Sequence, residues 1–136
     1  MEGVNGKVAP ICWSSKKLNR VTKSPLASET LALNEGADSG FLVASLIQEI
    51  FRMPSRPVVK CFTDNSSLTE TLKTSNIVSE RILRVDIARL REMVREEEIN
   101  VEWVPGKLQI ADALTKKGAS SEQLLRVINE STVHIL

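Results

Sequence analysis

Short apolar segments alternate with helical patterns along most of the chain, and this alternation limits the fold more than any other feature of the sequence. Strands are expected at residues 8–14, 57–64 and 99–106, where apolar and β-branched side chains stand next to proline, glycine or Asp-Asn. At least one helical segment follows each of them. The order strand, helix, strand, helix, helix, strand, helix, helix is typical of an α/β fold.

The longest helix is expected to begin at Ser24 and Pro25 and to end near Phe51. A hydroxyl at the N-cap followed by proline is a helix start signal, and apolar residues then recur at helical spacing. Gly36 and Gly40 lie one turn apart in this helix, and close packing against a sheet would explain two residues that weaken it. Further helices are expected at residues 66–73, from about residue 79, within residues 108–118 and at residues 120–129.

Length and composition favour one domain over residues 1–136, with residues 119–136 as a C-terminal helical tail. Apolar residues are 42% and charged residues 26% of the 136, which permits a hydrophobic core. No apolar run reaches the roughly eighteen residues of a membrane span, and the first ten residues lack the apolar centre of a secretion signal. We therefore expect an intracellular protein, cytoplasmic or nuclear, without a membrane partner.

The two cysteines indicate neither a disulfide nor a zinc site. Cys12 and Cys61 are far apart, form no CxxC pair and are accompanied only by the distant His134. Each lies in a strand-like segment, so two buried free thiols are expected.

A basic strip lies near the start of the chain. Between residues 3 and 28 there are five basic residues and no acidic one, although the net charge of the whole chain is only +1. Such a strip can contact phosphate groups. On charge alone, a solvated polar edge explains it equally well. The strip consists of Lys7, Lys16, Lys17, Arg20 and Lys23.

Three acidic residues differ in placement from the other fourteen. Asp64 ends an apolar strand, Asp112 starts a helix after a strand, and Glu29 lies in the first turns of the long helix. Each could serve only its own helix, by capping it or by interacting with its dipole. If they converge, their hard oxygen ligands would select Mg²⁺ or Mn²⁺, and a metal pair can hydrolyse phosphodiesters.

Several segments, in order, resemble the ribonuclease H domain of copia-type retrotransposon polyproteins. They are ICWSSKKLNRVTKSPLASETLAL, then CFTDNSSL, then LRVDIARLREMVREEEINVEWVPGKLQIADALTKKGAS. That family shows WSSKKQ, a TEAEY-like helix, DNQSA, HIDV and ADxLTK. The match covers residues 10–120, although Arg84 stands where the family has histidine and Asp86 is kept. We expect at most a structural ion pair for Asp86.

The resemblance implies a function and a set of site residues. Glu29, Asp64 and Asp112 fall on catalytic carboxylates that ligate Mg²⁺ (or Mn²⁺). The implied reaction is endonucleolytic hydrolysis of the RNA strand of an RNA–DNA hybrid. The hybrid and the reverse transcriptase part of the same polyprotein are the implied partners. Contacts with the nucleic-acid backbone are implied for Lys16, Lys17, Asn65 and Ser66.

The family's first aspartate has no counterpart here, since Glu2 is the only acid before Glu29. The expected fold is therefore a ribonuclease H-like mixed sheet flanked by helices, lacking the first, central strand and the second as well. Residues 4–8, or a strand exchanged with a second copy in a homodimer, would fill the gap. Loss of one of four carboxylates should reduce hydrolysis steeply. Two alternatives follow, namely a non-catalytic nucleic-acid-binding module and a protein–protein module that completes its sheet with a partner strand.

Overall fold

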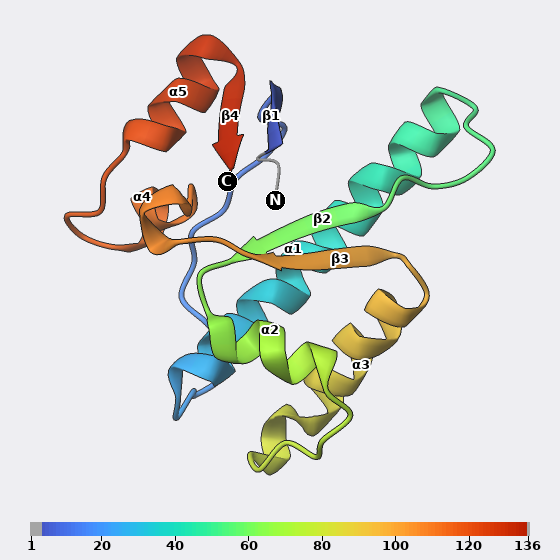
Figure 1. The fold of residues 1–136 in the computed structure, drawn as a ribbon, viewed down its shortest axis with the longest axis vertical. Helices are drawn as coiled ribbons and strands as arrows, with labels where there is room; N and C mark the ends of the chain where they lie inside the picture. Colours follow the sequence, from blue (N-terminus) through green and yellow to red (C-terminus); the bar gives the residue numbers. More distant parts are fainter. Residues whose placement is uncertain (1–3, 136) are drawn as a thin grey trace. The chain divides into compact units, whose positions relative to one another are not determined.

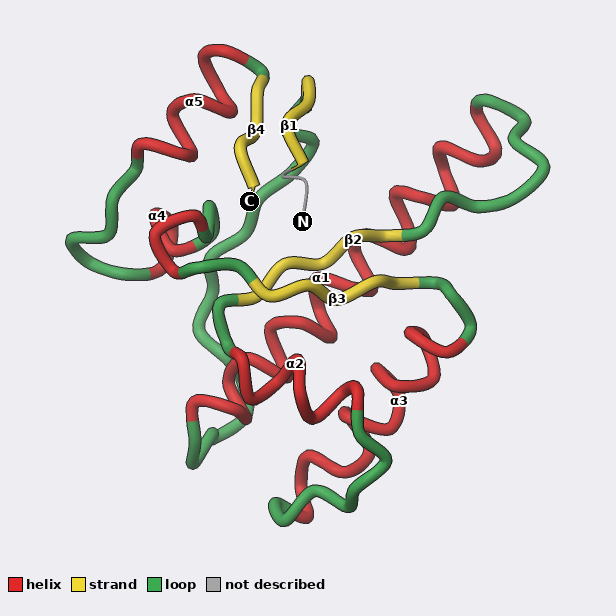
Figure 2. Tube along the Cα trace, in the orientation of Figure 1, coloured by secondary structure: helices red, strands yellow, loops and turns green. Residues whose placement is uncertain are grey.

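The computed structural model describes residues 4–135, which form a mixed α/β structure with small sheets. The chain divides into two compact units. Residues 18–103 form the larger one, and the residues up to 17 together with those from 104 onward form the smaller one. Figure 1 shows the helices and strands of each unit, and Figure 2 shows the loops and turns that connect these helices and strands.

The larger unit contains a pair of parallel strands and three helices. Strand β2 (Val59–Thr63) pairs in parallel with β3 (Ile99–Trp103), from Val59 opposite Ile99 to Thr63 opposite Trp103. A parallel pair needs a crossover connection, which here contains two helices. The helices of this unit are α1 (Pro25–Ile50), α2 (Ser66–Lys73) and α3 (Arg84–Arg95), with a 3-10 turn η1 (Arg81–Leu83) before α3.

The long helix α1 confirms the prediction for this segment and begins as expected. The Ser24 hydroxyl oxygen accepts a hydrogen bond from the backbone N–H of Ala27 at 3.1 Å, and proline follows at the first helical position. The two glycines of α1 differ. A β-carbon at Gly40 would lie 2.6 Å from Cγ1 of Val59, so Gly40 allows the close approach to the sheet that was predicted. At Gly36 no atom lies within 4 Å of such a carbon, and the packing explanation is wrong there.

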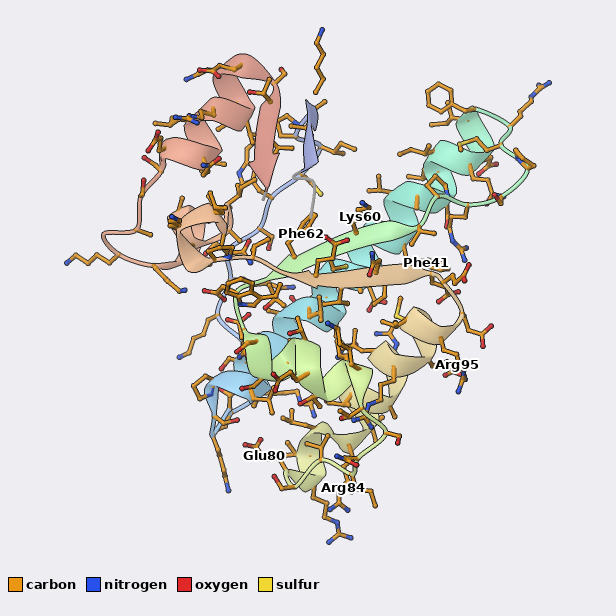
Figure 3. The ribbon with its side chains drawn as sticks, viewed as in Figure 1. Phe41, Lys60, Phe62, Glu80, Arg84 and Arg95 are labelled. Carbon is orange, nitrogen blue, oxygen red and sulfur yellow. The ribbon has the colours of Figure 1, made fainter. Side chains whose placement is uncertain are left out.

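The core of the larger unit lies on one face of the β2–β3 pair. Ile99, Val59 and Val101 face the helices, and alternation along the strands sends Lys60 and Phe62 to the other face (Figure 3). Helices α1, α2 and α3 therefore share one hydrophobic cluster with a single sheet face. Its buried members are Ala27, Leu33, Ala37, Leu68, Leu72, Leu83, Ile87, Leu90, Met93 and Ile99.

Two arginine contacts tie the loops of this unit to α3. Arg91 donates hydrogen bonds to the backbone oxygens of Thr71 and Asn76, at 2.7 and 2.9 Å from Nη2, and so holds the segment after α2. Arg20, from the basic strip, forms an ion pair with Asp86 at 3.1 Å. The structural ion pair expected for Asp86 is therefore present. Arg84 and Arg95 are exposed and project from α3 away from the strands (Figure 3).

The smaller unit has an antiparallel strand pair and two short helices. Strand β1 (Val4–Lys7) pairs with β4 (Thr132–Ile135), with Val4 opposite Ile135. A 3-10 turn at Gly106–Leu108 leads toward α4 (Asp112–Thr115), and α5 (Glu122–Glu130) precedes β4. Gly118 follows α4 with φ +82°, a backbone conformation that glycine adopts readily.

Several expectations for this unit are wrong. Residues 8–14 form no strand, and Cys12 within them is exposed, because Pro10 lacks the N–H of a ladder and the polar run from Ser14 provides no second apolar face. The strand at residues 4–7 pairs with β4 and not with β2, so it does not fill the expected gap in the sheet. Strand β4 itself was not predicted.

Candidate functional site

The candidate site lies at the carboxyl ends of the two parallel strands. Thr63 and Trp103 are register partners and the last residues of β2 and β3, and Asp64 follows Thr63 directly. The indole N–H of Trp103 donates a hydrogen bond to the backbone oxygen of Asp64 at 3.1 Å. The backbone N–H of Asn65 donates to the hydroxyl of buried Thr63 at 3.2 Å. These contacts hold the turn that presents Asp64 at the edge where ligands of α/β sheets usually bind.

Asp64 does not cap helix α2. The side-chain oxygen of Asn65 accepts a hydrogen bond from the backbone N–H of Leu68 at 3.0 Å, which makes Asn65 the N-cap. The simple structural role considered for Asp64 is thus filled by its neighbour. Asp64 and Asn65 are both half-buried, and Ser66, the first residue of α2, is exposed.

Glu29 lies in the same unit as Asp64, in the second turn of α1. The first turn of α1 contains no acidic residue, and Glu29 is half-buried next to Thr30, which is fully buried. Thr30 donates its hydroxyl hydrogen to the backbone oxygen of Leu26 at 2.7 Å, a bond within the helix. The side chain of Glu29 therefore starts from a well-packed part of α1.

Asp112 lies in the smaller unit, as the first residue of α4. One of its carboxylate oxygens accepts a hydrogen bond from Nζ of Lys116, one turn later, at 2.8 Å. An acid in the first turn of a helix also interacts favourably with the helix dipole. The local structural role considered for Asp112 is therefore present in this structure.

The structure places Glu29 and Asp64 in one unit and Asp112 in the other. Within residues 4–135, no three His, Cys, Asp or Glu side chains are arranged so that they could hold a metal ion. The chemistry of the three side chains suits Mg²⁺, which prefers carboxylate oxygens.

The predicted nucleic-acid-binding residues also fall into two groups. Lys16 and Lys17 are exposed in the irregular segment of the smaller unit, whereas Asn65 and Ser66 are at the start of α2 in the larger unit. The basic strip is divided in the same way, because its Arg20 and Lys23 belong to the larger unit. Arg20 is engaged by Asp86.

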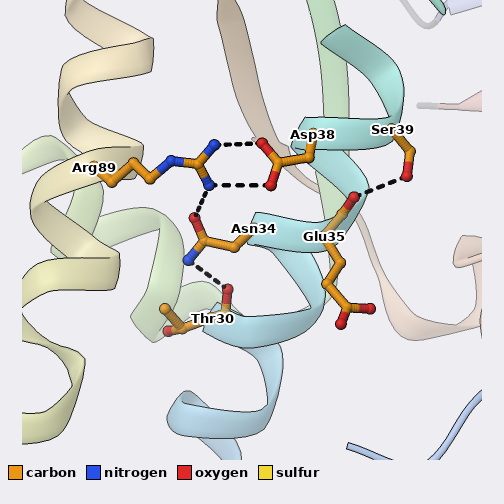
Figure 4. A network of polar contacts seen from close by, with 6 residues as sticks. All are labelled: Thr30, Asn34, Glu35, Asp38, Ser39 and Arg89. Carbon is orange, nitrogen blue, oxygen red and sulfur yellow. Dashed lines mark hydrogen bonds and ion pairs between the residues drawn. The ribbon is translucent and has the colours of Figure 1, made fainter. Parts of the chain in front are cut away.

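A polar network between α1 and α3 lies apart from these residues (Figure 4). Arg89 forms a two-pronged ion pair with Asp38 and donates to Oδ1 of Asn34 at 3.2 Å. The hydrogen bond to Asp38 raises the pKa of Arg89, so the guanidinium group keeps its positive charge. Buried Asn34 in turn donates to the backbone oxygen of Thr30 at 3.3 Å. This network fixes how the two helices pack.

Two cavities of the larger unit lie elsewhere and have no link to the predicted acids. One, of about 430 Å³, lies between α1 and α3 and is lined by Phe41, Met93 and Arg89 with four carboxylates. The other, of about 340 Å³, lies beside α2 and the segment that follows it. Neither is lined by Glu29 or Asp64.

Trp103 is a residue of this site that the sequence motifs do not single out. Alternation in β3 puts it on the same face as buried Ile99 and half-buried Val101, which predicts a core residue. The side chain is 51% exposed instead. Trp103 is the last paired residue of β3 and lies shortly before Pro105 and Gly106. This position at the end of a strand indicates that the helices need not cover its side chain.

Comparison with known protein families and with solved structures finds no match to this chain. No helix within residues 4–135 has both the length and the apolar character needed to cross a membrane.

Proposed function

We propose that this chain is a ribonuclease H-like domain derived from a copia-type retrotransposon polyprotein. The observation that carries the proposal is the position of Asp64, directly after a strand that runs parallel to its neighbour and beside a helix capped by Asn65. A carboxylate at this edge of a parallel strand pair is suited to bind a ligand. The order of the motifs over residues 10–120 supports the same family.

The proposed metal is Mg²⁺ (or Mn²⁺), for which the resemblance assigns Glu29, Asp64 and Asp112 as ligands, although no three such side chains within residues 4–135 are arranged to hold a metal ion in this structure. Bound there, the metal would activate water and stabilise the leaving oxygen during hydrolysis of the RNA strand of an RNA–DNA hybrid. Asp112 would have to exchange its ion pair with Lys116 for the metal. Lys16, Lys17, Asn65 and Ser66 would contact the backbone of the hybrid.

The proposal includes weak or no hydrolysis by this chain alone. Three of the four carboxylates implied by the resemblance have a match in the sequence, and a missing ligand lowers metal occupancy and misplaces the attacking water.

A strand exchanged with a second copy in a homodimer could complete the sheet. We further propose an intracellular setting, in the cytoplasm or nucleus, with the reverse transcriptase part of the polyprotein as a protein partner.

A cleavage assay tests this function. The full chain is incubated with an RNA–DNA hybrid and Mg²⁺ or Mn²⁺, alongside Asp64→Asn and, as a matched control, Glu70→Gln on the exposed side of α2. Weak cleavage that is lost in Asp64→Asn and kept in Glu70→Gln supports the proposal. Strong cleavage would contradict the view that three carboxylates are insufficient. Neither cleavage nor binding of the hybrid would overturn the proposal as a whole.

A second candidate function is non-catalytic nucleic-acid binding through the basic strip. Lys7, Lys16, Lys17 and Lys23 are exposed, which suits contacts with phosphate. Binding that weakens with salt, without turnover of the hybrid, would favour this function.

A third candidate is a module that completes its sheet with a strand from a partner chain. The molecular mass in solution tests it, because a protein that is purely monomeric exchanges no strand with a second copy.

A further inference from the structure

Three properties of Trp103 together indicate that its side chain can bind a ligand. Trp103 is 51% exposed, its ring N–H donates a hydrogen bond to the backbone oxygen of Asp64, and it ends the strand whose partner leads into Asp64. Burying a Trp side chain contributes a large hydrophobic stabilisation, so exposing half of one at a strand end forgoes much of it. The ring is nevertheless held in place by the hydrogen bond.

An aromatic ring that is both exposed and oriented can act as a stacking platform. Nucleobases in single strands and at unpaired ends stack on such rings, and sugars pack against them, without regard to sequence. Because the Trp103 ring is hydrogen-bonded to the backbone oxygen of Asp64, anything packed on the ring would lie near the turn that contains Asp64. A flexible surface aromatic would lose more conformational freedom on binding than this one.

We propose that Trp103 is a nucleic-acid-binding residue, whose indole packs against a sugar of the strand that passes Asp64. This inference rests on the proposed function and adds a contact that the sequence motifs do not assign. The contact carries no charge, so it complements the phosphate contacts expected for Asn65 and Ser66 at the start of α2. Its location places it at the carboxyl end of the sheet, beside the proposed metal ligand.

Two tryptophans allow a direct test by fluorescence. Trp13 lies in the smaller unit and is 72% exposed, so Trp13→Phe leaves Trp103 as the single reporter and Trp103→Phe leaves Trp13 as the matched one. Each full-length variant is titrated with an RNA–DNA hybrid in EDTA, which prevents turnover. Anisotropy of an end-labelled hybrid reports binding independently. We expect quenching of Trp103 that follows the binding curve.

Affinities of two variants at position 103 separate stacking from a structural role. Both Trp103→Phe and Trp103→Leu lose the hydrogen bond to Asp64, but only phenylalanine keeps an aromatic face. We expect Trp103→Leu to weaken binding at least about fivefold and Trp103→Phe clearly less. The salt dependence should stay the same in both, because no phosphate contact is lost. Thermal unfolding of each variant shows that it is folded.

The outcomes separate this inference from the proposed function. Binding of the hybrid without quenching of Trp103, or equal losses in the Phe and Leu variants, overturns the stacking role and leaves the proposed function standing. No binding of the hybrid by the unmodified chain at about 50 mM salt overturns both.

Discussion

Gly40 on α1 faces Val59 on β2 so closely that a β-carbon at position 40 would lie 2.6 Å from the Val59 Cγ1 atom. Valine is short and stiff, so its side chain cannot rotate away without strain. The missing side chain at Gly40 is therefore what allows the long helix to lie against β2.

Substitution of the two α1 glycines should change stability in opposite directions. We expect Gly40→Ala to lower the free energy of unfolding by about 1–3 kcal/mol, because the added methyl group overpacks against Val59. Gly36→Ala should raise it by about 0.4–1 kcal/mol, because position 36 is open and alanine favours the helix. Urea unfolding of both variants measures this difference.

A second substitution checks the cause. In a Val59→Ala background the added methyl at position 40 has room, so Gly40→Ala should cost much less there than in the unmodified chain. If the cost is the same in both backgrounds, the contact with Val59 does not explain the glycine.

The two glycines also show what could be predicted from the sequence. Helical periodicity and the Ser24-Pro25 signal located α1, because both are local properties of the chain. Which glycine meets the sheet depends on how the helix crosses it, and that crossing is set by long-range packing. The same reason explains residues 8–14, whose apolar composition suits a strand but which gain no partner.

The candidate site was predictable to a similar degree. Asp64 at the end of β2 follows from the apolar run and its Asp-Asn ending. That Asn65, and not Asp64, caps α2 depends on a one-residue difference in where the helix begins, which patterns do not resolve. Strand β4 was missed because its pairing with residues 4–7 joins opposite ends of the chain.

The end of α3 has a residue that is unsuited to its backbone conformation. Glu97 has φ 55°, and its N–H donates to the Val94 oxygen at 3.2 Å while the Glu98 N–H donates to the Met93 oxygen at 2.9 Å. This bonding is a Schellman motif, in which glycine is the preferred residue at the left-handed position. We expect Glu97→Gly to stabilise the protein by roughly 1 kcal/mol. Glu97→Ala is the matched control, since it removes the charge but keeps the β-carbon, and an equal gain would assign the effect to charge.

The contact of Arg89 with Asp38 should matter more than that of other exposed arginines on α3. Arg89→Lys keeps the charge but loses the two-pronged geometry and the bond to Asn34, so we expect a loss of about 0.5–1 kcal/mol. Arg95, whose acidic partners Glu92 and Glu96 belong to its own helix or its cap, is the control, and Arg95→Lys should be nearly neutral. Urea unfolding measures both, and a loss in Arg89→Lys no larger than that in Arg95→Lys would contradict a role for the two-pronged geometry.

The Cys61 thiol should make the protein less stable at alkaline pH. Burial raises the pKa of Cys61, so the folded state keeps the proton at a pH where the unfolded chain has already lost it. The associated stability is fully present below the unfolded pKa of about 8.5 and is lost as the pH rises through the folded value. The free energy of unfolding should therefore decline from about pH 8.5 upward, and no tyrosine is present in the sequence to add to the effect.

Cys61→Ala should flatten this decline, whereas Cys12→Ser, at an exposed thiol, should leave it unchanged. Unfolding curves between pH 7 and 10 decide the matter, and an unaltered decline in Cys61→Ala would assign it to other groups.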